Sequence, residues 1–328
     1  MKLEDKYLAL ISALDFNGKK LNAPEKGLDD EWSGWVRLDA TKADCREALV
    51  ALLPDVDEVI IGGLLTDETR PRIEEIDSNS LSGGLMMILR AANYNPGKNP
   101  HDMAAIRIWA DGKRFVTIQR QSILTLEDVQ KKIERPTVPV MKTGMLLAAI
   151  CNRLLERLEP ALRELDDSIA QLEDKVFHDA DHALSEQLSG YRRQAMVFKR
   201  HIAPQLEVLG RLRTLPLPWI EEQDRFFFAD AHDHFLRFVE GLDAVRDRCQ
   251  IMREELNVEM GNILNQRMYT LSIVSVIFLP LGVLTGLLGV NLAGIPFAEN
   301  PDAFNVFGGL LIAVVVLVLA LLKKRKWF

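Results

Sequence analysis

The pattern of apolar and polar residues divides the chain into a long mixed region and a nearly uncharged C-terminal one. No Asp, Glu, Lys, Arg or His occurs from 268 to 298, or again from 303 to 322. An apolar stretch of about 20 residues is long enough to cross the hydrocarbon core of a bilayer as a helix. The two stretches therefore predict a C-terminal transmembrane hairpin, whose helices are joined by a loop of about fifteen residues.

Charged residues at the ends of these stretches predict the orientation of the hairpin. Arg267 precedes the first stretch, and the range 323–326 is entirely basic. The connecting loop contains no Lys or Arg but has two acids, Glu299 and Asp302. Because Lys and Arg accumulate on the cytoplasmic side of a membrane, both termini are expected in the cytoplasm and the loop outside.

Before the hairpin, local periodicity predicts an α/β domain followed by helices. The ranges 34–40 and 104–120 have the patterning of strands, and Asp111-Gly112 is a hairpin signal inside the second. The range 41–54 is predicted as a helix, and from Met145 onward the apolar spacing is helical.

One of these helices carries a heptad seam, with apolar residues that step alternately by three and four. They are Phe235, Phe238, Leu242, Val245, Cys249, Met252 and Leu256. No Pro or Gly pair interrupts the chain before the first apolar stretch, so one continuous helix is predicted from about 225 to 288, about 95 Å long. The predicted division is a cytosolic α/β domain at 1–140, a helical stalk at 141–267 and the transmembrane hairpin with its basic tail at 268–328.

The first apolar stretch has two unlike faces. Steps of four and three give a small, polar stripe that begins in the stalk: Glu254, Val258, Gly261, Asn265, Met268, Ser272, Ser275, Leu279, Gly282 and Gly286. Large aliphatic residues lie about 180° away: Val274, Ile277, Leu281, Leu284 and Leu288. The aliphatic face suits lipid, whereas the polar face needs protein or water, because unsatisfied polar groups are costly in hydrocarbon.

The stripe alone leaves two interpretations open. Gly282 and Gly286 form the small-x-x-x-small pattern that lets helices pack closely. Alternatively the stripe lines a pore, which requires an oligomer with this helix at its axis. Asn291, after a glycine that can end the helix, favours the pore. A ring of such side chains and nearby carbonyls would present neutral oxygens to a hydrated divalent cation, although Asn in a turn is by itself ordinary turn chemistry.

Composition argues against several other classes of protein. The chain has 40 Lys and Arg against 47 Asp and Glu, a net charge of −7, which does not suit nucleic acid. Cys45, Cys151 and Cys249 are far apart and odd in number, so they are predicted to be reduced packing residues. Motifs of zinc peptidases, P-loop ATPases and serine hydrolases are absent, so neither an enzyme nor a bound cofactor is predicted.

Two histidine pairs are weaker candidates for metal binding. His178 and His182 are four residues apart, a spacing that can hold zinc on a helix. His232 and His234 alternate on a predicted helix, which suits chelation poorly. Solvated helix surface is the more ordinary interpretation of both pairs, and a metal site at either is a secondary hypothesis.

The combined features resemble the CorA metal-transporter superfamily, and in detail its zinc-transporting ZntB branch. The acidic cytosolic domain, long stalk helix, C-terminal hairpin, G-x-N tripeptide and basic tail all contribute, over essentially the whole chain. Segments that are similar to the branch are "TRPRI" (69–73), "RHIAPQ" (200–205), "LPWIEEQDR" (217–225), "MYTLSIVSVIFLP" (268–280) and "GVNLAGIP" (289–296). Val290 stands where magnesium-transporting relatives usually have Met.

The resemblance implies a funnel-shaped homopentamer in the bacterial inner membrane, with the first span lining the pore. It implies that Gly289, Val290 and Asn291 form a selectivity filter at the outer mouth. It places Asn265 and Met268 at the inner constriction, and both positions belong to the stripe already defined. It also implies zinc uptake that is coupled to protons.

Two features bear on the movement of cations and protons. Glu299 and Asp302 lie in a loop that can be glycine-rich in other members of the branch, so attraction of cations at the outer mouth is expected to differ. The stripe between Asn265 and Asn291 has no group that titrates near neutrality. A proton carrier must then lie elsewhere: a cytosolic histidine, Glu299, pore water, or the stalk acids Glu254, Glu255 and Glu259.

The sequence thus predicts a zinc transporter whose partners are a divalent cation as substrate, the lipid membrane and further copies of the chain. A magnesium or cobalt channel of the same architecture is the alternative. A membrane-tethered structural or signalling oligomer, in which the stripe only packs helices, is the alternative from a different class.

Overall fold

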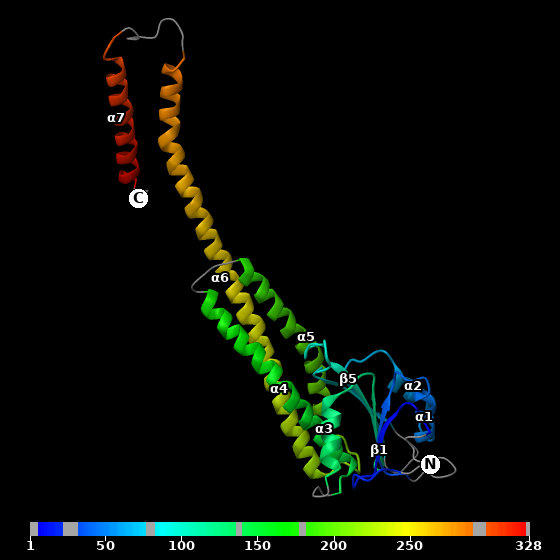
Figure 1. Cartoon of the computed structure of the whole chain (residues 1–328). Coiled ribbons are helices and arrows are strands. Elements are labelled where there is room, and N and C mark those ends of the chain that lie inside the picture. The colour runs from blue at the N-terminus through cyan, green and yellow to red at the C-terminus, as the bar shows by residue number, and fades with distance from the viewer. Residues whose placement is uncertain are drawn as a thin grey trace. The chain divides into compact units, whose positions relative to one another are not determined.

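The computed structural model describes residues 6–21, 32–76, 83–135, 140–176, 182–290 and 300–325. The chain forms two compact units, Met1–Arg253 and Glu254–Phe328. Figure 1 traces both of them from the N-terminus to the C-terminus. The boundaries predicted near 140 and 267 do not coincide with the division between these two units, and they stay a prediction.

A six-stranded sheet forms the α/β part of the first unit. Its strands are β1 (Leu10–Leu14), β2 (Gly34–Asp39), β3 (Arg72–Ile76), β4 (Gly84–Ala91), β5 (Ala104–Ala110) and β6 (Arg114–Gln119). They lie in the order β1-β2-β6-β5-β4-β3. All neighbouring pairs are antiparallel except β2 and β6, which run parallel from Gly34 beside Arg114 to Asp39 beside Gln119.

The predicted hairpin at Asp111-Gly112 is confirmed as the connection between β5 and β6. Asp111 Oδ1 accepts hydrogen bonds from the backbone N–H groups of Lys113 (2.8 Å) and Arg114 (2.7 Å). The Arg114 guanidinium returns to the Asp111 carboxylate at 2.8 Å and also binds Asp55. A short polar side chain that satisfies the turn backbone is the reason that Asp favours such a hairpin.

Helices cover both faces of the sheet. Helices α1 (Cys45–Leu52) and α2 (Glu58–Leu65) pack on one face over a core that includes Leu49, Ile61 and Trp109. Helices α3 (Leu124–Ile133), α4 (Thr143–Val176) and α5 (His182–Leu212) lie on the other side, as Figure 1 shows. The α/β fold predicted for this region is therefore confirmed.

The long helix predicted from the heptad seam is confirmed as α6 (Glu222–Leu288), which contributes to both units. The seam residues Phe235, Leu242, Val245, Cys249, Met252 and Leu256 are all buried. Ion pairs add to this packing: Arg248 of α6 reaches Asp166 (2.9 Å) and Glu173 (2.6 Å) of α4. Apolar residues on one stripe bury against neighbouring helices because three- and four-residue steps share a face.

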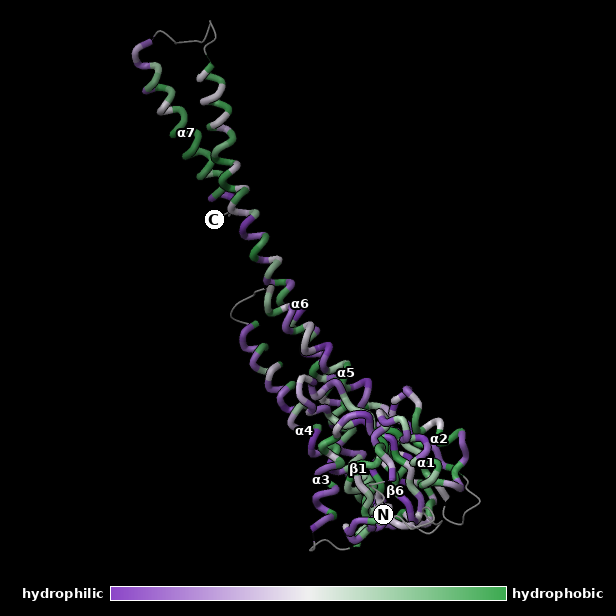
Figure 2. The backbone as a smooth tube through the Cα atoms, turned by 45° about the vertical axis from the view of Figure 1, so that its right-hand side comes forward, coloured by the Kyte–Doolittle hydropathy of each residue, from purple (hydrophilic) through white to green (hydrophobic). Residues whose placement is uncertain are grey.

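The second unit consists of the end of α6 and a further helix, α7 (Ala303–Lys324). Both helices are long and apolar enough to cross a membrane. Figure 2 shows apolar residues along α7 and the last part of α6, in contrast to the mixed colouring of the first unit. The C-terminal hairpin of two apolar helices is thus confirmed, whereas its assembly into a funnel-shaped homopentamer stays a prediction.

Candidate ion-conduction site

The candidate pore residues lie on one face of α6 because the helix is continuous through the apolar stretch. Asn265, Met268, Ser275, Leu279 and the stripe glycines are exposed or half-buried in the single chain. Met268 is 61% and Leu279 71% exposed, which is high for apolar side chains of this size. An exposed apolar surface of this kind marks contact with lipid, with another protein chain or with both.

The glycine pair on the stripe does not pack helices within one chain. A Cβ atom added at Gly282 or Gly286 would meet no atom within 4 Å. Close approach of two backbones is the purpose of a small-x-x-x-small pattern, and α7 makes no such approach here. The small residues are therefore open to another copy of the chain or to water.

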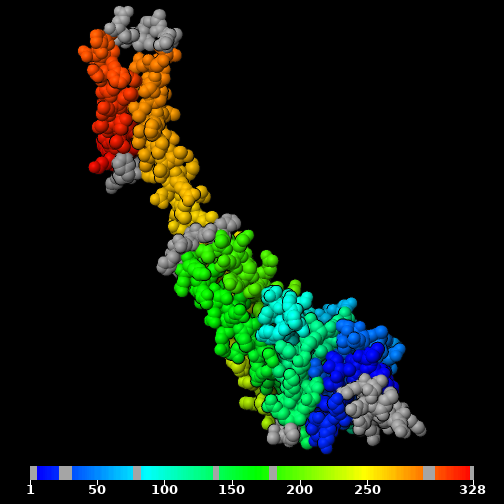
Figure 3. All heavy atoms as spheres, viewed as in Figure 1, coloured from blue at the N-terminus to red at the C-terminus, as the bar shows by residue number. Residues whose placement is uncertain are grey.

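Part of the aliphatic face of α6 lies toward α7. Ile277, Leu281 and Leu284 are half-buried. A groove between the helices is lined by Phe278, Leu281, Gly282 and Thr285 of α6 and by Leu311, Ile312, Val315 and Val316 of α7. Figure 3 shows α7 lying against the last part of α6.

The aliphatic face of α6 is only partly covered, since Val274 and Leu288 on it are exposed. The expectation that lipid contacts this face therefore stays a prediction. Of the stripe, Gly282 borders the groove with α7, whereas Ser275, Leu279 and Gly286 are exposed in the single chain.

The hydroxyl groups on the stripe are satisfied by their own helix. Ser272 Oγ donates to the carbonyl of Met268 (2.8 Å), and Ser275 Oγ donates to that of Leu271 (2.9 Å). Such bonds to the carbonyl four residues earlier let a hydroxyl sit in an apolar span without an unpaired donor. The hydroxyl oxygens keep lone pairs that can accept a hydrogen bond from water.

Helix α6 ends at Leu288, as the following glycine predicted. The backbone N–H of Gly289 donates to the carbonyl of Thr285 at 2.8 Å and closes the last turn. Gly289 and Val290 belong to the described residues, whereas Asn291 and Glu299 lie outside them. Asp302 precedes α7, and its backbone N–H donates to Asn300 Oδ1 at 2.9 Å.

The stalk acids lie on the first turns of the second unit. Glu254, Glu255 and Glu259 are all exposed on α6. Glu259 Oε2 accepts a long hydrogen bond from Asn262 Nδ2 at 3.3 Å. These carboxylates are thus open to solvent in one chain, on the segment that precedes the apolar stretch.

The histidine candidates do not gather a ligand set in the described part of the chain. His232 Nδ1 lies 3.1 Å from Asp233 Oδ1 and 3.4 Å from the Arg213 guanidinium, while His234 Nε2 lies 3.8 Å from Asp230 Oδ1. His178 and the side chain of His182 lie outside the described residues. Among the residues that the structure does describe, no group of three or more His, Cys, Asp or Glu could hold a metal ion.

The three cysteines are free and buried, as predicted. Burial raises the pKa of Cys45 to about 11, helped by Asp39 and Asp44, and raises that of Cys151 to about 12. Thiols of this kind are unreactive packing groups, because the thiolate is the form that attacks electrophiles or binds metal.

Sequence periodicity did not reveal which basic side chains the fold brings together. Arg70, Arg90 and Arg200 line one cavity of the first unit, although they lie far apart along the chain. The only local signal was the density of basic residues in each segment, which does not indicate where the segments meet.

Comparison with known proteins agrees with this architecture. Residues 31–324 match the family described as CorA-like Mg2+ transporter protein. The chain is 30% identical over 305 residues to the zinc transport protein ZntB of Yersinia enterocolitica, across 93% of this chain and 91% of the relative.

Solved structures give the same result for the fold. The full-length CmaX protein superposes with a TM-score of 0.81 at 25% identity, covering 97% of this chain and 98% of its own. The CorA magnesium transporter of Methanocaldococcus jannaschii superposes with a TM-score of 0.79 at 22% identity, covering 98% and 99%. Nearly the whole chain, including both apolar helices, therefore has counterparts in solved structures.

Proposed function

The chain belongs to the CorA-like Mg2+ transporter family, and on that premise we propose that it carries zinc across the bacterial inner membrane. The family consists of membrane transporters of divalent metal cations rather than enzymes. In the proposal, the α6 helices of a homopentamer surround the pathway, and the α7 helices lie outside them.

The arrangement of the hairpin is the observation that carries this proposal. Most of the stripe, including Ser275, Leu279 and Gly286, is exposed in the single chain and is available for a pathway or for other copies of the chain. Polar groups in a span favour a water-filled interior over lipid. A ring of α6 helices would place these residues at its centre.

Zinc is proposed as the substrate for two reasons: the name of a relative, and Val290, which stands where magnesium-transporting relatives usually have Met. The relative that is 30% identical across nearly the whole chain is named a zinc transport protein. The magnesium transporter from Methanocaldococcus jannaschii is 22% identical, so its likeness supports the fold alone. A magnesium or cobalt channel of the same architecture is the second candidate, and the name of the family is in its favour.

The proposed filter binds a cation through neutral oxygens. Asn291 would lie at the outer mouth with the backbone of Gly289 and Val290, while Asn265 and Met268 would narrow the inner end. Amide and carbonyl oxygens can hydrogen-bond the water shell of a divalent cation without holding it as tightly as a ring of carboxylates. Glu299 and Asp302 would raise the local concentration of cations near this mouth.

The membrane potential supplies a driving force for inward movement. One elementary charge that crosses 100 mV gains about 2.3 kcal/mol, so a divalent cation gains about twice this amount. Proton coupling needs a titratable group, and the stripe from Asn265 to Gly286 has no ionisable residue. We therefore place the coupling at the exposed stalk acids Glu254, Glu255 and Glu259.

The topology of the proposal has both termini in the cytoplasm. Lys323 and Lys324 form the last turn of α7, followed by Arg325. Basic residues at the end of a span favour the cytoplasmic side.

Metal uptake into proteoliposomes tests the substrate and the coupling together. Zinc, magnesium and cobalt are compared side by side, with and without an inward proton gradient. We expect zinc uptake that the gradient enhances. The triple variant Glu254→Gln, Glu255→Gln, Glu259→Gln should keep uptake without a gradient and lose the enhancement.

The control for the triple variant is Glu240→Gln, which removes an exposed carboxylate from the part of α6 in the first unit. Magnesium flux that ignores the gradient would contradict the zinc proposal and support a passive channel. Full enhancement in the triple variant would place the coupling site elsewhere. No flux of any metal would favour a membrane-tethered oligomer.

A further inference from the structure

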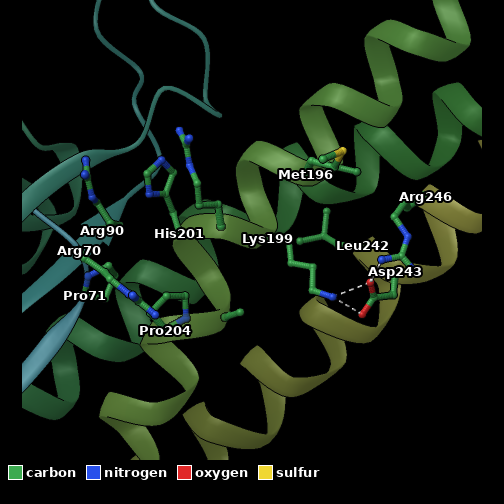
Figure 4. Close-up of a pocket in the computed structure, with 13 residues that line it drawn as sticks. Arg70, Pro71, Arg90, Met196, Lys199, His201, Pro204, Leu242, Asp243 and Arg246 are labelled. Atoms are coloured by element: carbon green, nitrogen blue, oxygen red, sulfur yellow. Dashed lines mark hydrogen bonds and ion pairs between the residues drawn. The ribbon is translucent and has the colours of Figure 1, made fainter.

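A cavity of about 860 Å³ lies in the first unit. Its walls come from the segment before β3, from β4, from α5 and from α6. In Figure 4, Arg70, Arg90 and His201 lie on the side of the strands, and Lys199, Asp243 and Arg246 lie on the side of α6. Charged residues from three separate parts of the fold therefore line one space.

The lining of the cavity is strongly cationic. It includes Arg70, Arg90, Lys199, Arg200 and Arg246, against a single carboxylate, Asp243, among the described lining residues. The sign of this local charge is opposite to the net charge of the chain, which is −7. Local charge of this sign attracts anions.

The one carboxylate is already used by two of the cations. Lys199 Nζ lies 2.6 Å and 2.7 Å from the two oxygens of Asp243. Arg246 Nη1 lies 3.3 Å from the same carboxylate, and its Nη2 pairs more closely with Asp247 at 2.8 Å. Asp243 therefore has little capacity left to neutralise the remaining arginines.

The other cations have no ion pair within the described part of the chain. Arg90 is half-buried and donates to the backbone carbonyls of Thr69 (2.9 Å) and Met103 (2.7 Å). Arg70 and Arg200 are exposed at the cavity. Carbonyl oxygens orient a guanidinium but do not cancel its charge.

The electrostatics of His201 report the same excess of charge. Burial, followed by the positive charges of Arg90 and Arg200, lowers the pKa of His201 to about 4. Burial and Arg200 also lower the pKa of Arg90. A bound anion would relieve this repulsion, because it places negative charge between like-charged groups.

The remaining wall is apolar. Pro71, Met196, Ala203, Pro204 and Leu242 contribute to it. Pockets for small molecules typically have volumes of roughly 300–1,000 Å³ and combine apolar walls with a few charged groups. The concave shape and mixed lining suit a compact ligand with a charged end and an apolar end better than an acidic protein segment.

We propose that this cavity binds a polyphosphate-bearing small molecule, with a nucleoside triphosphate as the ligand class that best matches its charge and its apolar wall. Arg70 and Arg200 would contact the phosphates, since guanidinium groups bind phosphate in a bidentate manner. Pro71, Met196 and Leu242 would cover the nucleoside. This site is separate from the cation pathway, and the proposal holds or fails independently of the transported metal.

Calorimetric titration of the purified full-length protein in detergent tests the proposal. The buffer contains EDTA, so that ATP is present as the free anion and no divalent cation links it to the transport pathway. ATP, inorganic tripolyphosphate and adenosine are titrated separately. We expect ATP and tripolyphosphate to bind, with an affinity that falls as salt is added.

The variant Arg70→Gln, Arg200→Gln should weaken binding of both phosphate ligands by at least about tenfold, as expected for loss of charge-assisted hydrogen bonds. Both side chains are exposed, and neither forms an ion pair with a described residue, so the variant should fold. The matched control is Lys131→Gln, Arg163→Gln, which removes two exposed cations from α3 and α4 outside the cavity. It should bind as the unmodified protein does.

The comparison of ATP, tripolyphosphate and adenosine distinguishes a nucleotide ligand from inorganic polyphosphate. ATP that binds more tightly than tripolyphosphate supports a nucleotide, and equal affinities support inorganic polyphosphate in the same cavity. Adenosine that binds as tightly as ATP would overturn the proposal, and so would unchanged affinity in Arg70→Gln, Arg200→Gln. A change in oligomeric mass with no change in ATP binding would assign the cavity to a subunit interface and also overturn it.

Discussion

Uncharged and ionisable side chains lie in different parts of this protein. The candidate pathway on α6 offers hydroxyl, amide and thioether groups, while ionisable groups lie in the stalk and around the cavity of the first unit. Some of this could be predicted from residue types: the isolated cysteines are buried and free. The cationic cavity could not, because Arg70, Arg90 and Arg200 meet only through the sheet and α5.

The pKa of His201 gives a prediction at this scale. In the folded protein this pKa is lowered to about 4, whereas the unfolded value is about 6.5. Between these values the unfolded state binds more protons, so the contribution of the neutral histidine to stability is present above pH 6.5 and is lost as pH falls toward 4.

The measurement compares the denaturation of the ligand-free protein with that of His201→Gln at pH 7.5 and pH 5.5. On acidification the unmodified protein should lose about 1 kcal/mol more stability than the variant, a value reduced for partial solvent exposure. An equal loss in both proteins would mean that His201 titrates normally in the fold.

At the scale of elements, helix periodicity was the strongest signal in the sequence. The heptad seam predicted α6, and the uncharged stretches predicted the two apolar helices. The Asp-Gly signal located the turn between β5 and β6. The parallel pairing of β2 with β6 was not predicted, because the partner of a strand distant in sequence is set by packing and not by local pattern.

The packing of α7 against α6 also could not be predicted from the sequence. The groove between α6 and α7 takes Leu281 from the aliphatic face and Gly282 from the stripe, so composition alone did not show which residues of α6 border α7. A face that suits lipid equally suits another apolar helix, since the two surroundings have similar polarity.

A matched pair of glycine substitutions tests which face borders the pathway. An added Cβ meets no atom within 4 Å at Gly286 of α6 or at Gly309 of α7, so Gly286→Val and Gly309→Val should both leave the single chain folded. Gly286→Val should reduce metal uptake by at least about tenfold, because bulk at a narrow pathway adds a barrier of about 1.4 kcal/mol or more.

Gly309→Val should transport as the unmodified protein does. The measurement is the initial rate of metal uptake into proteoliposomes that contain equal amounts of each protein. Equal rates for the two variants would show that the Gly282–Gly286 face of α6 does not border the pathway.

At the scale of the whole molecule, one chain is not sufficient for conduction. Two apolar helices cannot surround water, and the small, polar face of α6 is largely exposed within the described part of the chain. The proposed homopentamer resolves both points, because symmetry would place five copies of this face around one axis. The number five comes from the family resemblance, while the need for several copies follows from the hairpin itself.

The most direct test of the account is zinc uptake by Asn291→Ala in proteoliposomes, beside Asn305→Ala as the control. Asn305 is an exposed amide near the start of α7, so its loss removes the same chemistry from outside the proposed filter. The oligomeric mass of each variant is measured first, so that a failure of assembly is recognised. The account predicts that Asn291→Ala assembles normally and loses zinc flux, while Asn305→Ala keeps it. Normal flux through a correctly assembled Asn291→Ala protein would contradict the proposed filter and, with it, the pathway along α6.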